Sequence, residues 1–318
     1  MKRFTFAATI SLALFCIPAD VPATFCRNIG KESGFALQKT KSSDFERTLS
    51  AGGKKRPQIR VSTNNPAVLN VSVNNFDAIN WFDLIRKTFG GRVSGDIHGR
   101  ITKTALKELK IKNEAIEKVI EANWRMDWDE YQKVLPPVPN DKYDPAHHFD
   151  RTYGVSHAAA FKRGARYVRQ QRYIVLAGLR GEDGRTVNDA LQAMGRGLHA
   201  LQDFFSHSNV IDLSPEDWSA VMKALESAAD PPPGLKITGY DRGSKLIGDE
   251  YEHDAFSKEN ANKNAESRSP MKAGAQAFDP NKTKFQRARE AAVQCSRDWL
   301  IDIRKEAGNI VWARIEKM

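Results

Sequence analysis

The pattern of apolar residues along the chain predicts a mostly helical protein. From residue 76 onward, apolar side chains recur at intervals of three and four residues, which places them on one face of an α-helix. Strand-like alternation is nearly absent. The pattern predicts helices over 76–89, 98–112, 114–133, 157–178, 186–208, 215–228 and 284–316. The expected fold class is therefore all-α, built as a multi-helix bundle.

The first residues of the chain predict a secretory signal peptide. Lys2 and Arg3 precede an apolar run of about 11 residues, and small residues follow at Val21 and Ala23. A membrane-spanning helix needs roughly 20 apolar residues, and no later run comes close. We therefore expect a signal peptide over 1–23, a secreted or periplasmic protein, and no transmembrane segment in the mature chain.

Composition divides the rest of the chain into two parts. Residues 24–92 are mainly polar and contain one predicted helix, so we interpret them as an N-terminal extension. Residues 93–318 carry the remaining helical patterns and are expected to form the catalytic domain. Proline-rich and polar stretches predict long loops at 229–248 and 257–283 within it.

Cysteines and charge add two expectations. Cys16 leaves with the signal peptide, and we expect the remaining pair, Cys26 and Cys295, to form a disulfide in an oxidising compartment. Lipidation of Cys26 is the alternative. The whole chain has a formal net charge of +10, which favours polyanionic partners, either nucleic acid or anionic lipid.

The densest group of candidate metal ligands lies in the helix predicted over 186–208. His199, Asp203 and His207 are spaced by four residues, so at 3.6 residues per turn they share one face of the helix. Imidazole nitrogen and carboxylate oxygen are ligands that zinc accepts. Burying these groups without partners would cost several kcal/mol, and a metal ion would remove that cost. The spacing therefore favours a metal site.

The segment GLHALQDFFSHSN at 197–209 resembles the zinc-dependent phospholipase C superfamily, and its Het-C (heterokaryon incompatibility) branch more closely. Four further short matches follow the family order, at residues 95–106, 122–132, 147–150 and 250–260. The resemblance implies a phospholipase C or single-strand nuclease-like fold with two or three zinc ions in its core. The metal ligands that it implies are His98, Asp127, His148, His199, Asp203, His207 and His253.

Two positions depart from the family pattern. The phospholipases use the amine of the mature N-terminal residue as a ligand, and Asp96 is the candidate to replace it here. They also carry a Glu four residues after the last histidine, where this chain has Ser257. The candidates to replace that Glu are Asp249, Asp254 and Glu259. His147 and His157 have no counterpart in the family, and we expect both to be structural or to support the ligands.

The resemblance implies hydrolysis of a phosphodiester, with Asp127 orienting or deprotonating the attacking water. The expected substrate is a phospholipid headgroup at a membrane surface, because residues 204–209 match the Het-C form. A single-strand nuclease is the first alternative, and the positive charge suits it. The second alternative is a non-catalytic toxin or interaction protein that zinc stabilises. Neither the headgroup nor the oligomeric state follows from the sequence.

Overall fold

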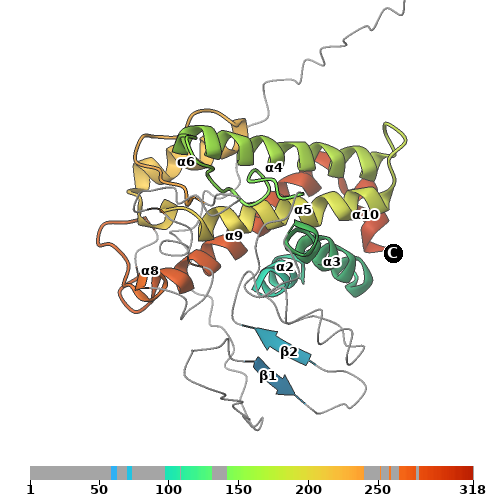
Figure 1. Ribbon diagram of the computed structural model, residues 1–318. Helices are drawn as coiled ribbons and strands as arrows, with labels where there is room; N and C mark the ends of the chain where they lie inside the picture. Colours follow the sequence, from blue (N-terminus) through green and yellow to red (C-terminus); the bar gives the residue numbers. More distant parts are fainter. Residues whose placement is uncertain are drawn as a thin grey trace, which may run out of the picture.

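The computed structural model of the chain describes residues 59–62, 70–73, 97–107, 109–130, 142–239, 251, 258, 265–276 and 279–317. This part of the chain is mostly helical (Figure 1), which confirms the all-α class. The helices, in chain order, are α2 (Ile97–Lys107), α3 (Asn113–Glu130), α4 (His157–Arg180), α5 (Val187–Ser206), the 3-10 helix η1 (Val210–Asp212), α6 (Pro215–Ser227), α8 (Ala265–Arg268), α9 (Lys284–Ala307) and α10 (Asn309–Glu316).

Five of the predicted helices match α2 to α6 closely, and the last one differs. Residues 284–316 form two helices, because the chain breaks at Gly308 with φ 79°. Glycine adopts this positive φ without the steric cost that a side chain would bring. The short helix α8 falls within the predicted 257–283 loop. The predicted 76–89 helix lies outside the described residues.

A two-stranded antiparallel sheet occurs in the segment interpreted as an extension. Strands β1 (Ile59–Ser62) and β2 (Asn70–Val73) pair with Ile59 opposite Val73. No strand was predicted here from the sequence. Each strand has only four residues, so alternation of apolar and polar side chains is too brief to stand out as a pattern.

Helix α5 is the centre of the fold. It packs against α2, α3, α4 and α9, and α4 runs beside it along most of its length (Figure 1). Thr186 and Asp189 cap its first turn with reciprocal hydrogen bonds between side chain and backbone. Nearly every later residue of α5 is buried. A helix that is apolar on most of its faces belongs in the core, and the polar groups that α5 carries are therefore buried with it.

A close approach between α3 and α5 depends on Gly195. A Cβ atom at this position would lie 2.6 Å from Cβ of Ala122 and 2.8 Å from the backbone nitrogen of Asn123, and it would also meet the carbonyl oxygen of Val119. Real Cβ atoms are not found at such distances. The glycine thus lets the two backbones touch, one turn before His199 on α5.

The loop over 142–150 turns inward at Phe149. This residue has φ 51°, a left-handed conformation that is unusual for a bulky side chain. Its ring is fully buried, 5.0 Å from the ring centroid of Phe204, and it covers Gly164 of α4 so closely that a Cβ there would lie 2.7 Å from it. The packing holds the strained backbone in place and turns the neighbouring His148 toward the core.

Cys295 lies fully buried in α9 and is disulfide-bonded. Its expected partner, Cys26, lies outside the described residues, as do the predicted signal peptide and cleavage site. None of the described helices combines the length and apolar character needed to cross a lipid bilayer.

Candidate metal centre

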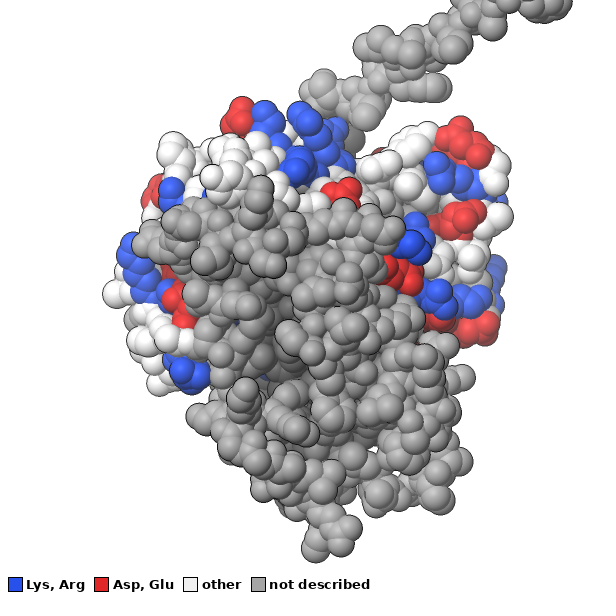
Figure 2. Space-filling view, in the orientation of Figure 1, with Lys and Arg blue, Asp and Glu red and all other residues white. Residues whose placement is uncertain are grey.

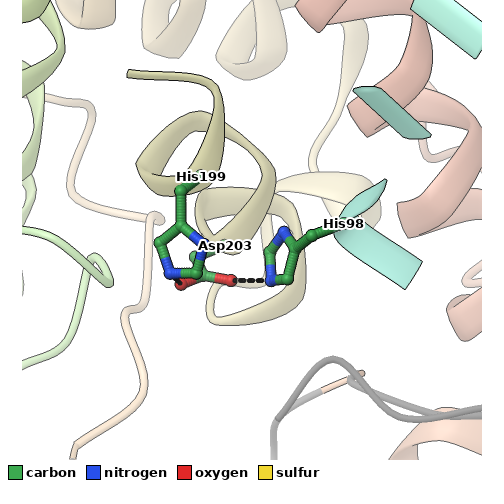
Figure 3. Close-up of side chains that lie close together, drawn as sticks. All are labelled: His98, His199 and Asp203. Carbon is green, nitrogen blue, oxygen red and sulfur yellow. Dashed lines mark ion pairs between the residues drawn. The ribbon is translucent and has the colours of Figure 1, made fainter. Parts of the chain in front are cut away.

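Five of the predicted ligands meet in the core. His98 comes from α2, Asp127 from α3, His148 from the 142–150 loop, and His199 and Asp203 from α5. Each of the five is at most 3% exposed. Figure 3 shows Asp203 between His199, on its own helix, and His98, which faces it from α2. We call this set the metal centre.

Three donor atoms form a nearly equilateral triangle. The Oδ1 atom of Asp127 lies 3.3 Å from Nε2 of His199 and 3.6 Å from Nδ1 of His148, and these two nitrogens are 3.2 Å apart. Ligands held about 2.0–2.2 Å from a tetrahedral zinc ion are roughly 3.3–3.6 Å from one another. The triangle therefore has the size of one face of a zinc coordination tetrahedron.

Asp203 connects this triangle to a second group of donors. Its Oδ2 atom lies 3.0 Å from Nδ1 of His148 and 3.1 Å from Nε2 of His199, and its Oδ1 atom lies 3.1 Å from Nε2 of His98. The second group that could hold an ion is His98, His199 and Asp203. One carboxylate thus faces both groups.

Side chains behind the histidines fix which ring nitrogen faces inward. The outer Nδ1 of His98 donates to Oε1 of Gln202 at 2.8 Å, and the outer Nδ1 of His199 donates to Oδ1 of Asn123 at 3.2 Å. Thr102 orients both amides, because its hydroxyl accepts from Asn123 Nδ2 and from Gln202 Nε2, each at 3.0 Å. Each Nε2 is therefore left with its lone pair toward the centre, as metal-binding histidines require.

Glu130 orients the ring of His148 in the same way. The Nε2 atom of His148 lies 3.3 Å from Oε2 of Glu130, which leaves Nδ1 facing Asp127 and Asp203. The other oxygen of Glu130 lies 2.5 Å from Nδ1 of His147. Burial opposes ionisation of Glu130, but the hydrogen bonds with both histidines outweigh it and lower its pKa to about 2. Glu130 is therefore a fixed negative charge behind the centre.

Without a metal ion, the centre holds its positive charge as protons. Burial works against protonation of His199, but the carboxylates of Asp127 and Asp203 prevail and raise its pKa to about 10. The pKa of His148 is also raised, against the effect of burial, by its hydrogen bonds with Asp203 and Glu130. The surrounding histidines lower the pKa of Asp203 despite its burial. The site is thus organised around a positive charge, which a cation supplies equally well.

Hydrogen bonds alone leave two oxygens of the centre unsatisfied. The Oδ1 atoms of Asp127 and Asp203 are buried, and no donor in the described residues reaches either with hydrogen-bond geometry. Imidazole nitrogens do lie 3.1–3.3 Å from them. Close approach without hydrogen-bond alignment is expected of donor atoms that surround a common ion. The residues present therefore fit a metal ion.

His207 and the remaining predicted residues stand outside these two groups. His207 ends α5, and its Nδ1 donates to the backbone carbonyl of His148 at 2.7 Å, so it holds the loop that carries His148. His157 accepts a hydrogen bond from the Ile237 backbone at 3.0 Å, a structural role as expected. His253, Asp96, Asp249, Asp254 and Glu259 lie outside the described residues.

Sequence reasoning missed the residues that support the centre. Asn123 and Glu130 stand four residues before and three residues after Asp127 on α3, so the same-face spacing used for α5 would have found both. Asp150 was also missed. It is fully buried, and its carboxylate accepts from the hydroxyls of Tyr143 and Thr238 and lies 3.4 Å from Nδ1 of His207. No helical spacing connects Asp150 to these partners.

Comparisons of the chain with family models, with curated proteins and with solved structures found no significant match.

Proposed function

We propose that the protein is a secreted, zinc-dependent hydrolase of phosphodiester bonds that acts on phospholipid headgroups in the manner of the phospholipases C. The observation that carries the proposal is the triangle formed by Asp127, His148 and His199, joined through Asp203 to a second donor group. The five short sequence matches to the zinc-dependent phospholipase C superfamily add the reaction class.

Zinc is the ion that best suits these donors. Neutral imidazole and carboxylate, at separations that match a tetrahedron, are the ligand set of zinc sites rather than of calcium or magnesium sites, which take oxygen ligands. Bound zinc would supply a Lewis acid that activates water and polarises a phosphoryl oxygen. Asp127 orients the attacking water or takes its proton, and Asn123, Gln202 and Glu130 hold the imidazoles in register.

Of the two proposed substrate classes, we favour a lipid over nucleic acid. The positive formal charge suits either polyanion. On the face drawn in Figure 2, however, Lys and Arg side chains lie among Asp and Glu side chains over the described surface. A nucleic-acid site is expected to concentrate basic side chains on one face. The resemblance of residues 204–209 to the Het-C form also favours the lipid.

Burial of the centre supports a second candidate function. All five donors are at most 3% exposed, as expected of a structural zinc site that water and substrate do not enter. In this alternative, the ion stabilises a non-catalytic toxin or interaction protein. The two candidates agree on the metal and differ only in turnover.

The deciding experiment measures metal content and hydrolysis on the same preparation. Elemental analysis of the purified protein should give two or three zinc ions per chain. Bis-p-nitrophenyl phosphate should then be hydrolysed, with activity lost in chelator and restored by zinc. Headgroup release from phosphatidylcholine vesicles should exceed cleavage of single-stranded DNA at equal protein. Zinc without turnover would establish the structural alternative, and less than one zinc per chain would exclude both.

A further inference from the structure

A second candidate site lies on the other side of Glu130 from the metal centre. A cavity of about 770 Å³ lies among α3, α4 and α5, and residues of the 142–147 stretch also line it. Glu130 and His147 form part of its wall. Pockets for small ligands commonly measure about 300–1,000 Å³, so this cavity has the size of a metabolite or headgroup site.

Three arginines line the cavity, and one of them has buried nitrogens without a hydrogen-bond partner in the described part of the chain. Arg163 and Arg166 come from α4, and Arg196 comes from α5. The Nε and Nη2 atoms of Arg163 are buried and have no hydrogen-bond partner within the part of the chain that the structure describes. Arg166 and Arg196 are exposed, and neither makes an ion pair in that same part of the chain. The buried nitrogens of Arg163 therefore carry a desolvation cost, which an anion would remove, and the other two arginines can add charge to the same site.

Three acidic residues line the wall, of which Asp129 is exposed, while Glu130 and Asp144 bond on the histidine side of the cavity. Glu130 accepts from His147, from His148 and from the backbone nitrogen of Asp144 at 2.9 Å. Asp144 accepts from the backbone nitrogen of Ala146 and lies 3.8 Å from Nε2 of His147. These carboxylates are thus occupied with the histidine side of the cavity. The arginines on α4 and α5 remain available to a ligand.

Gln171 adds an uncharged acceptor to the same wall. It is 4% exposed, and its Oε1 atom is buried with no hydrogen-bond partner among the described residues. Because an amide oxygen is an acceptor, a ligand that satisfies it must carry a donor such as a hydroxyl group. Met126 and Ile174 add apolar side chains to the lining. The cavity therefore presents arginine side chains, a buried amide oxygen and a small apolar surface.

We propose that this cavity binds a small phosphate monoester that carries hydroxyl groups, with the phosphate held by Arg163, Arg166 and Arg196 and a hydroxyl held by Gln171. Arginine suits a phosphate because its planar fork makes two parallel hydrogen bonds to the oxygens. The site shares no candidate ligand with the metal centre. The ester is either a soluble metabolite or a phosphorylated lipid headgroup, since both present the same group.

Calorimetric titration of the purified full chain with glycerol 3-phosphate and with inorganic phosphate tests the proposal. Both should bind, and Arg163→Gln should weaken each by about tenfold or more, since losing a charge-assisted fork costs at least that factor. Gln171→Leu should weaken glycerol 3-phosphate and leave inorganic phosphate within about twofold, since only the ester has alcohol hydroxyls. Arg169→Gln, on the same helix but outside the cavity, is the matched control and should change neither.

Two further measurements distinguish a lipid headgroup from a soluble metabolite, and binding in the cavity from binding at the metal centre. Sedimentation with phosphatidylcholine vesicles containing phosphatidylinositol 4-phosphate, lost in Arg163→Gln, would identify a lipid headgroup. Binding of the soluble ester alone would identify a metabolite. Phosphate binding that chelator removes and Arg163→Gln leaves intact would place the anion at the metal centre and overturn the proposal. Absence of binding by either soluble probe would also overturn it.

Discussion

The amide oxygen of Gln202 lies 2.8 Å from Nδ1 of His98, on the side of the ring away from Asp203. The two residues come from different helices, α5 and α2, and the bond decides which nitrogen of His98 can bind a metal. A residue outside the two donor groups thus controls which atom of His98 is offered to a metal ion. Supporting residues of this kind commonly change metal affinity by about 10–100-fold.

Gln202→Leu should therefore weaken zinc binding by about 10–100-fold. The change removes the acceptor that holds His98, and it also leaves Nδ2 of Asn123 with one partner fewer. Competition with a chromophoric chelator would measure the affinity. Gln192→Leu, on the same helix and half-buried, is the matched control. Equal affinity in the two variants would contradict the role given to Gln202.

Asp203→Asn should remove one zinc ion and reduce turnover by orders of magnitude. The amide keeps the size of the side chain but loses the charge that faces both donor groups. Melting temperature should fall, because bound metal stabilises the native state by mass action. Chelator-treated wild type should melt close to the variant. A variant with full zinc content and normal melting would show that α5 does not bind the metal.

Zinc affinity should rise with pH between about 6.5 and 10. The pKa of His199 is raised to about 10 by Asp127 and Asp203 against the effect of burial, so zinc must displace a proton throughout this range. Each displaced proton changes the affinity about tenfold per pH unit. Titrations at several pH values, in buffers of different ionisation enthalpy, would count the protons. A pH-independent affinity would exclude displacement at this centre.

Chelator-treated protein should show the opposite trend in stability. A histidine whose folded pKa is raised stabilises the fold fully below its unfolded pKa of about 6.5, and this contribution is lost as pH rises toward 10. The denaturant midpoint of the metal-free chain should therefore fall over this range, while that of zinc-saturated protein should not. If the denaturant midpoints of the two forms changed with pH in the same way, the raised pKa of His199 in the metal-free protein would be contradicted.

Gly195→Ala should destabilise the fold by about 1–3 kcal/mol, the usual cost of inserting a methyl group into packed structure. The new Cβ meets the backbone of α3 beside Asn123, so zinc affinity should fall as well. Gly234→Ala is the control, because its Cβ would make only ordinary contacts at 3.9 Å or more. Urea unfolding of both variants would measure the difference. Equal urea midpoints would show that α3 can move away from the new methyl group without loss of stability.

The disulfide of Cys295 should connect it to Cys26. Peptide mapping of the unreduced protein would identify the bond. Closing a loop this long is worth up to about 5 kcal/mol in the chain-entropy model, so reduction should lower the melting temperature. Cys26→Ser should lower it equally, and reduction should then add nothing. Detection of a free Cys26 thiol in unreduced, folded protein would rule out the pairing.

Helical spacing predicted the fold better than it predicted the site. The period of the apolar residues located α4 and α5 to within a few residues, because that period is a property of the local chain. It also placed His199 and Asp203 on one face, and the structure confirms that they converge. The break at Gly308 was missed, because the backbone angle of a glycine inside a helical pattern cannot be predicted from the sequence.

The rest of the site depends on packing between distant segments. The sequence matches chose His148 over His147, and the structure shows that Glu130 contacts both, one ring on each side. No spacing rule predicts that arrangement, since it follows from the left-handed turn at Phe149. The arginine-lined cavity likewise arises where three helices meet. Its three arginines do not stand out in the sequence, where each is one of many charged residues in the helical segments.

The donors of the metal centre come from four separate stretches of chain, at residues 98, 127, 148 and 199–203. Ions held by these donors would act as cross-links that close several loops at once. Each tenfold increase in free zinc above the dissociation constant would then add about 1.4 kcal/mol to the free energy of unfolding. The lifetime of the protein would be set by the zinc supply of its surroundings, so the same chain would persist where zinc is plentiful and be degraded where it is withheld.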